Sequence, residues 1–323
     1  MSTTPETSGP VTRTRRVYVA SIALPIAVVA AFWVGLINMN SVYRFVGWAI
    51  SEGGTELQSG VAYGPSERQK LDIYRPLSAS AREAAADTPI ILFVYGGSWR
   101  DGDRSIYRFV GDAFASRGYK TVIPDYRLYP GVQFPGFVND VAATYRWIED
   151  NLLRPGQRIV LVGHSAGAHM SALVALDPRY LQAVGSDPMR LAGWVGLAGP
   201  YAFEPTTWPS TRDVFATASD VDEPRPVAHV DTGEKPALLF HGLDDEVVKV
   251  WNMRELAKAL RAVDGSVRTV ELPGVAHVGI VLALAKPFRG KGPVLQETLA
   301  FIEGLPDASG SPDARASGLV GGR

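Results

Sequence analysis

Five residues around Ser165 have the types and the spacing of a nucleophilic serine site. Gly163, Ser165 and Gly167 form a G-x-S-x-G pattern directly after the apolar run Ile159–Val162. In this pattern a strand turns sharply into a helix and exposes the serine hydroxyl at the turn. The pattern alone is weakly specific, because small residues are common in turns. A serine hydroxyl also needs a histidine base and an orienting acid, so the rest of the chain has to supply both.

The chain carries these groups in the order serine, acid, histidine. Asp244 and Asp245 follow the apolar run Leu238–Phe240, and His277 follows the strand-like segment Ser266–Gly274. Adjacent residues in a turn point in different directions, so only one of the two aspartates is expected to reach the histidine. His277 is the predicted base, because the other histidines lie in the serine turn, on the helix after it, in a proline-flanked loop or at a strand end. These four are His164, His169, His229 and His241.

A tetrahedral intermediate would also need backbone N–H groups aimed at its negative oxygen. Ala166 supplies one, because it follows the nucleophile at the start of a helix, where the helix dipole also favours an anion. Gly97 and Ser98 are the expected second source, since they follow an earlier buried strand. Glycine there lets the backbone approach the substrate closely. Asp125 and Asp140 are isolated acids, and each is expected to form a helix cap or a buried hydrogen bond rather than to bind a metal.

Composition excludes several classes of function. The chain has 323 residues with 46% hydrophobic and 20% charged, which is ordinary for a globular protein. Its net charge of -1 provides no basic field for nucleic acid. The absence of cysteine excludes disulfides, thiolate catalysis and cysteine-bound metals. No metal-binding or nucleotide-binding motif is present, so we expect no cofactor.

The N-terminal region predicts a membrane anchor. Residues 1–16 are expected to form a disordered tail, which contains three arginines near its end, and the uncharged run Val17–Met39 follows. About 20 apolar residues are enough to cross a bilayer as a helix. The alternative is a cleaved signal peptide, whose apolar region is usually only about 7–15 residues. The arginines predict a cytoplasmic N-terminus and a catalytic domain on the extracytoplasmic side, or a secreted domain if the segment is cleaved.

The remaining chain alternates strand-like and helical segments. Residues 40–60 are interpreted as a connector, 61–304 as one catalytic domain and 305–323 as a disordered tail. Alternation of this kind predicts a mostly parallel sheet with helices on both faces. Expected strands are Arg68–Pro76, Pro89–Gly97, Tyr119–Arg127, Ile159–Val162, Leu191–Gly199, Pro236–Gly242 and Ser266–Gly274, and expected helices are Ser105–Arg117 and Val138–Leu152.

Several longer stretches resemble a known family. "YGGSW", "DYRLYP", "FPGFVNDVAATYRWI", "GHSAGAHMSALVALDPRYL" and "LAGPYAF" are similar to α/β-hydrolase esterases of the carboxylesterase and feruloyl-esterase-like group, to which kynurenine formamidase and isoprenylcysteine methylesterase are related. The resemblance runs from about Tyr63 to Glu303 and implies the α/β-hydrolase fold. It implies Ser165 as nucleophile, Asp245 as acid and His277 as base, since Asp245 matches the acid of an H-G-x-x-D-x-x-V pattern.

One position departs from the family pattern. The oxyanion motif of the group usually begins with histidine, as H-G-G, whereas Tyr95 stands there in this chain. We expect the oxyanion hole to survive the change, but substrate preference does not transfer from the relatives. Residues expected near the pocket are Trp99, Tyr129, His164, Phe203 and Trp208, the last two from an insertion over residues 201–235.

Three functions fit these residues. The first is a serine hydrolase that cleaves small-molecule carboxylic esters through an acyl-enzyme. The second is an amidase or formamidase that uses the same triad. The third is a non-catalytic, membrane-anchored binding domain with the same fold, which is disfavoured because no member of the triad is missing. Ester hydrolysis is preferred, because an alcohol leaves more easily than an amine.

Overall fold

The computed structural model describes residues 39–78 and 87–306. The tail over residues 1–16, the predicted anchor up to residue 38 and most of the predicted C-terminal tail lie outside the described residues. Within the described part, none of the helices has the length and apolar character needed to span a bilayer. The chain divides into two compact units, residues 1–46 and 47–323, and the second contains the sheet and the candidate site.

The second unit is built on an eight-stranded sheet with the order β1-β2-β4-β3-β5-β6-β7-β8. Strand β2 pairs antiparallel with both β1 and β4, and all other neighbouring strands are parallel. This confirms the expected mostly parallel sheet. The strands are β1 (Thr55–Ala62), β2 (Lys70–Pro76), β3 (Ile90–Val94), β4 (Thr121–Pro124), β5 (Ile159–His164), β6 (Leu191–Leu197), β7 (Ala237–Gly242) and β8 (Val267–Leu272).

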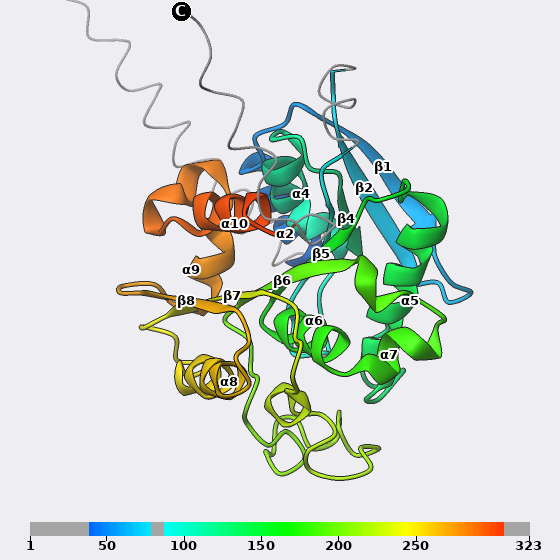
Figure 1. The fold of residues 1–323 in the computed structure, drawn as a ribbon. Coiled ribbons are helices and arrows are strands. Elements are labelled where there is room, and N and C mark those ends of the chain that lie inside the picture. Colours follow the sequence, from blue (N-terminus) through cyan, green and yellow to red (C-terminus); the bar gives the residue numbers. More distant parts are fainter. Residues whose placement is uncertain (1–38, 79–86, 307–323) are drawn as a thin grey trace, which may run out of the picture. The chain divides into compact units, whose positions relative to one another are not determined.

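Helices cover both faces of this sheet, with α5, α6 and α8 on one side and α4, α9 and α10 on the other (Figure 1). The α-helices are α2 (Met39–Ala49), α4 (Arg108–Ala115), α5 (Gly136–Asn151), α6 (Ala166–Leu176), α7 (Pro178–Ala183), α8 (Trp251–Ala262), α9 (His277–Leu282) and α10 (Val294–Glu303). Short 3-10 helices are η1 (Arg104–Tyr107), η2 (Pro188–Arg190), η3 (Pro226–His229) and η4 (Lys286–Lys291). The helix expected over Ser105–Arg117 corresponds to η1 followed by α4. The helix expected over Val138–Leu152 corresponds to α5.

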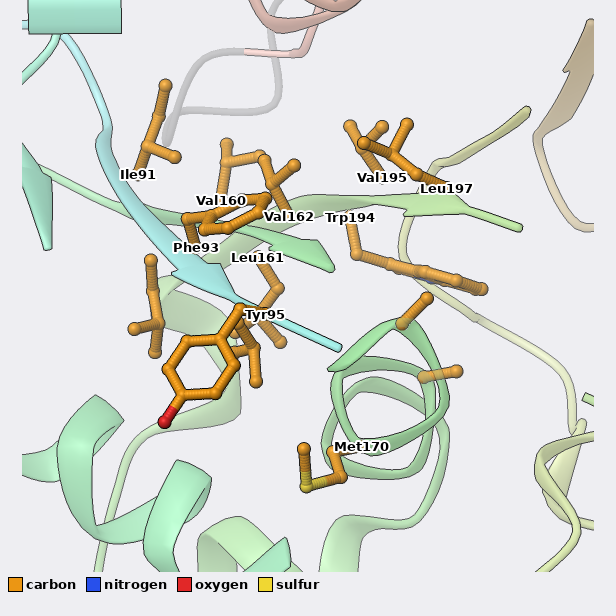
Figure 2. Packing of buried hydrophobic residues seen from close by; sticks show 14 of the residues in the cluster. Ile91, Phe93, Tyr95, Val160, Leu161, Val162, Met170, Trp194, Val195 and Leu197 are labelled. Atoms are coloured by element: carbon orange, nitrogen blue, oxygen red, sulfur yellow. The ribbon is translucent and has the colours of Figure 1, made fainter. Parts of the chain in front are cut away.

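The core lies on both faces of the central strands. Every residue of β3, β5, β6 and β7 is buried, as expected for parallel strands that helices cover on each side. Successive side chains of a strand point to opposite faces. In Figure 2, Leu161 and Trp194 point toward the side of α6, which carries Met170, while Val160 and Val195 point to the other side. The rigid centre of the sheet therefore fixes the strand ends from which the candidate site is built.

The predicted connector over residues 40–60 needs correction. It contains α2 and most of β1, and β1 is part of the sheet. Strand β1 lies at the sheet edge, where only one neighbour pairs with it, and most of its residues are at least partly exposed. A polar, half-exposed edge strand lacks the apolar run that identifies a buried strand, and its pairing partner is set by tertiary contacts.

Candidate active site

The candidate nucleophile, Ser165, lies at a strained turn between β5 and α6. Ser165 has φ 54° and ψ −122°, a conformation that is uncommon for a residue with a side chain. Its N–H donates to the carbonyl of Leu197 on β6 at 2.9 Å, which holds the turn against the sheet. The flanking glycines are required by space: a Cβ on Gly167 would lie 2.0 Å from the carbonyl oxygen of Val94, and one on Gly163 would lie 2.4 Å from the Gly167 oxygen.

Ser165, His277 and Asp245 form one chain of hydrogen bonds. The Ser165 Oγ lies 2.8 Å from Nε2 of His277, and Nδ1 of His277 lies 2.7 Å from Oδ2 of Asp245. The three side chains come from the end of β5, the loop after β7 and the start of α9. All three residues are at least nine-tenths buried. The structure thus brings together residues that lie 80 and 32 positions apart in the sequence.

The hydrogen bonds determine where the protons lie. Burial alone would raise the pKa of the Asp245 carboxyl, but hydrogen bonds from His277 and from the N–H groups of Val247 and Val248 hold it below its ordinary value. An ionised carboxylate only accepts hydrogen bonds, so Nδ1 of His277 carries the proton. Nε2 is then the acceptor for the Ser165 hydroxyl. This is the tautomer that a general base at Ser165 requires.

Two further histidines support the loops that carry the triad. His241 is fully buried and donates from Nε2 to the carbonyl of Val248 at 2.7 Å, which fixes the acid loop. His164 donates from Nε2 to the carbonyl of His277 at 3.1 Å. Burial and the nearby His277 lower the pKa of His164 to about 3, so it stays neutral. Both residues therefore act on the position of the triad, and burial lowers the pKa of His241 as well.

The loop after β3 lies directly against the nucleophile. A Cβ on Gly96 would be 2.8 Å from the Ser165 Cβ, so only glycine permits this approach. The next three residues, Gly97, Ser98 and Trp99, all have positive φ, at 137°, 52° and 59°. Ala166 is the first residue of α6, and its N–H has no acceptor within the helix. The loop and the helix start thus flank Ser165, as an oxyanion hole requires.

A pocket of about 230 Å³ opens beside Ser165. Four of the predicted residues, Ser98, Trp99, Phe203 and Trp208, line it together with Ser165 and Ala166. The sequence reasoning missed the remaining lining residues, which are Pro200, Ser210, Thr211, Val247, Val248, Lys249, Trp251 and Asn252. Most of these flank the acid loop or lie in the insertion. Their proximity to Asp245 and Phe203 along the chain is the only sequence signal that points to them.

Two residues predicted near the pocket are not among those that line it. His164 is 4% exposed, and its ring donates to the carbonyl of His277 at the start of α9. The ring of Tyr129 is covered by the guanidinium of Arg100, whose Cζ lies 4.2 Å from the ring centroid. Arg100 in turn donates to the carbonyl of Ser210. His164 thus lies beside the triad histidine and Tyr129 beside Arg100, and neither is among the residues that line this pocket.

With this geometry in place, comparisons with known proteins identify the family. The sequence model of the prolyl oligopeptidase family matches residues 136–305, which is more than half of the chain and includes the three triad residues. The BD-FAE family model matches residues 71–188. The chain therefore belongs to the prolyl oligopeptidase family and has the α/β-hydrolase fold. Both matched segments lie in the unit that carries the sheet and the candidate site.

Two curated relatives match this chain over about two thirds to three quarters of its length. Esterase LipC of Mycobacterium tuberculosis is 31% identical over 67% of this chain and 58% of its own length. An isoprenylcysteine α-carbonyl methylesterase of Arabidopsis thaliana is 24% identical over 73% of this chain and 59% of its own length. This chain therefore spans a little over half of these curated relatives.

Solved structures share the same α/β-hydrolase fold. Esterase B of Lactobacillus rhamnosis, in a structure with a tributyrin phosphonate, has a TM-score of 0.68 at 21% identity and covers 86% of this chain and 94% of its own. The butyrate-bound esterase 2 of Thermogutta terrifontis has a TM-score of 0.63 at 21% identity, with 77% and 94% coverage. At this identity the likeness establishes the fold.

Proposed function

We propose that this protein is a serine hydrolase that cleaves carboxylic esters through an acyl-enzyme. The observation that carries the proposal is the continuous hydrogen-bonded chain from Ser165 through His277 to Asp245, at 2.8 and 2.7 Å. The two relatives named above are an esterase and a methylesterase, which supports ester hydrolysis over other reactions of the same fold.

The first half-reaction transfers the acyl group to Ser165. As Oγ attacks the ester carbonyl, its proton moves to Nε2 of His277, and Asp245 stabilises the imidazolium. The carbonyl oxygen becomes negative and accepts hydrogen bonds from the N–H of Ala166 and from the loop at Gly97 and Ser98. The bond between the carbonyl carbon and the ester oxygen then breaks. The departing oxygen takes the proton from Nε2 and leaves as the alcohol.

The second half-reaction returns the enzyme to its starting state. A water molecule gives a proton to Nε2 of His277 while its oxygen attacks the acyl carbonyl. The same N–H groups bind the second oxyanion. The bond to Oγ of Ser165 then breaks, Oγ takes the proton from Nε2, and the carboxylic acid leaves.

The pocket fits the acyl side of such an ester. Its lining includes Ser98 and Ala166, on the oxyanion side of the nucleophile, whereas the imidazole that protonates the alcohol is not among the lining side chains. Phe203, Trp208 and Trp251 make it largely apolar. Its volume of about 230 Å³ is below the roughly 300–1,000 Å³ typical of pockets for drug-sized ligands. We therefore propose short, apolar acyl groups as the preferred substrates.

Amide hydrolysis is the second candidate. The match to the prolyl oligopeptidase family covers all three triad residues and favours it. The ester remains the preferred substrate, because its alkoxide leaves more easily than an amine that has not been protonated. Matched p-nitrophenyl esters and p-nitroanilides of acetate, butyrate and octanoate separate the two activities.

The assay has three informative outcomes. Ester turnover that Ser165→Ala abolishes supports the proposal, with butyrate expected to be cleaved faster than octanoate. Faster cleavage of the anilide than of the matched ester would favour the amidase. A folded protein that turns over none of the substrates would contradict both enzymatic functions.

A separate proposal concerns location. The uncharged run Val17–Met39 after three arginines supports a single-pass anchor, with the N-terminus in the cytoplasm and the catalytic unit on the other side of the membrane. Retention in the membrane pellet after carbonate washing, together with an intact N-terminus by mass spectrometry, is expected. A soluble product that has lost the N-terminal part of this run would instead support a cleaved signal peptide.

A further inference from the structure

A buried polar network lies outside the triad and connects both ends of the oxyanion loop, defined here as residues 96–103. Tyr95 precedes this loop and is fully buried. Its hydroxyl donates to Oδ1 of Asp125 at 2.6 Å. The same oxygen accepts the backbone N–H of Arg104, which follows the loop, at 2.8 Å. One carboxylate oxygen therefore binds the residue on each side of the loop.

Two arginines complete the network. Arg104 also pairs with Oδ2 of Asp125 and donates from Nε to Asp72 at 2.8 Å. Arg68 donates from Nη2 to the Tyr95 hydroxyl at 2.9 Å and to the carbonyl of Gly102, within the loop, at 3.0 Å. The buried carboxylates are thus balanced by cations, as buried charges require. Arg68, Tyr95, Arg104 and Asp125 are called the loop clamp below.

The loop itself has a conformation that needs external support. Ser98 and Trp99 carry side chains at positive φ, which costs free energy and persists only where the surroundings fix it. The loop also packs directly on the clamp, since a Cβ on Gly102 would lie 2.5 Å from Cε2 of Tyr95. At the opposite side it touches the nucleophile through Gly96. The loop is therefore held in place by contacts with the loop clamp on one side and with Ser165 on the other.

We propose that Tyr95 is a positioning residue, which acts through Asp125 to hold the N–H groups of the oxyanion loop in the geometry that the transition state requires. This rests on the proposed function of Ser165. It also gives a role to the tyrosine at the position where the family pattern has histidine, because the Tyr95 hydroxyl binds Asp125 directly. Preset donors stabilise the oxyanion without reorganising during the reaction.

The test is Tyr95→Phe, which keeps the ring and removes the hydroxyl. Loss of a whole oxyanion donor costs about 10²–10³-fold in kcat, so a displaced loop should cost roughly 10–100-fold. KM for p-nitrophenyl acetate should change less than about 3-fold, because the interaction forms in the transition state. The affinity for a trifluoromethyl ketone, which forms an oxyanion on Ser165, should fall in parallel with kcat.

Tyr74→Phe is the matched control. Tyr74 is as buried as Tyr95, and its hydroxyl has no hydrogen-bond partner within the described part of the chain. The Tyr74→Phe variant should retain wild-type kcat and inhibitor affinity. Arg68→Gln is a second test at a partly exposed residue and should lower kcat in the same way if Tyr95→Phe does not fold.

The outcomes separate the clamp from the proposed function. Folded Tyr95→Phe with wild-type kcat and inhibitor affinity would overturn the clamp while leaving the esterase in place, provided that Ser165→Ala is inactive. If Tyr95→Phe does not fold, an unchanged kcat in Arg68→Gln would contradict the proposed role of the loop clamp. A wild-type protein without any hydrolytic activity would instead remove the proposed function, on which the clamp depends.

Discussion

Replacement of Asp245 by asparagine tests the triad at its acid. In the structure one carboxylate oxygen, Oδ1, accepts the N–H groups of Val247 and Val248 at 2.9 and 2.8 Å. The other, Oδ2, accepts from Nδ1 of His277. The amide oxygen of asparagine must take the place of Oδ1, because only an acceptor can bind the N–H groups of both Val247 and Val248. The amide NH₂ then faces Nδ1 of His277.

The size of the effect follows from the tautomer. A facing NH₂ donates, so Nδ1 has to accept and the imidazole proton moves to Nε2. Nε2 can then no longer take the proton of Ser165. The same replacement in a serine protease triad lowers kcat by about 10⁴-fold. We expect a loss of that order here, which corresponds to about 5.4 kcal/mol of transition-state stabilisation.

The neighbouring acid gives a matched control. Asp244 is exposed, and Asp244→Asn makes the same chemical change one residue away. Steady-state kinetics with p-nitrophenyl butyrate should show the loss in Asp245→Asn alone, while thermal unfolding checks that both variants are folded. Activity of Asp245→Asn within tenfold of wild type, or an equal loss in Asp244→Asn, would refute the reasoning.

Three further changes have defined outcomes. Gly97→Ala should lower kcat at least 100-fold by distorting the oxyanion loop, since its Cβ would lie 2.0 Å from the Asp101 carbonyl oxygen; near wild-type kinetics would contradict this. Phe203→Ala should raise kcat/KM for octanoate relative to butyrate esters by widening the pocket, and an unchanged ratio would argue against that acyl site. The pKa of His164 is lowered to about 3 in the folded chain. The contribution of neutral His164 to the free energy of unfolding is therefore complete above about pH 6.5. It falls between about pH 6.5 and pH 3, because over this range the unfolded chain binds a proton that the folded chain does not. His164→Gln should flatten this fall, by up to about 1.4 kcal/mol per pH unit in urea unfolding, and an identical slope would count against a neutral His164.

The sequence predicted that Ser165, Asp245 and His277 lie close together, because parallel strands end at one edge of a sheet. Ser165 and Asp245 each follow a buried apolar run, and His277 follows the last strand. Runs of this kind are easy to recognise, and the order along the chain then places the three groups at the same edge. The choice of Asp245 over Asp244 needed the family pattern, since spacing alone left both open.

Other features depend on contacts that sequence patterns do not encode. Strand β1 is polar and lies at an edge, so neither its composition nor its position marked it as part of the sheet. The sequence left open whether Asp125 caps a helix or forms a buried hydrogen bond, because its partner Tyr95 lies 30 residues away. Tyr129 was expected near the pocket, yet Arg100 covers its ring. In each case the outcome depended on tertiary contacts between segments that lie apart in the sequence.

Covalent labelling with a fluorophosphonate measures the central claim most directly, because the reagent reacts with an activated serine. Peptide mapping of the labelled wild type should find one equivalent of adduct, on Ser165, and none in Ser165→Ala. Labelling of Asp245→Asn should be much slower at the same site. An adduct on a different serine, or equal labelling of wild type and Ser165→Ala, would contradict the account.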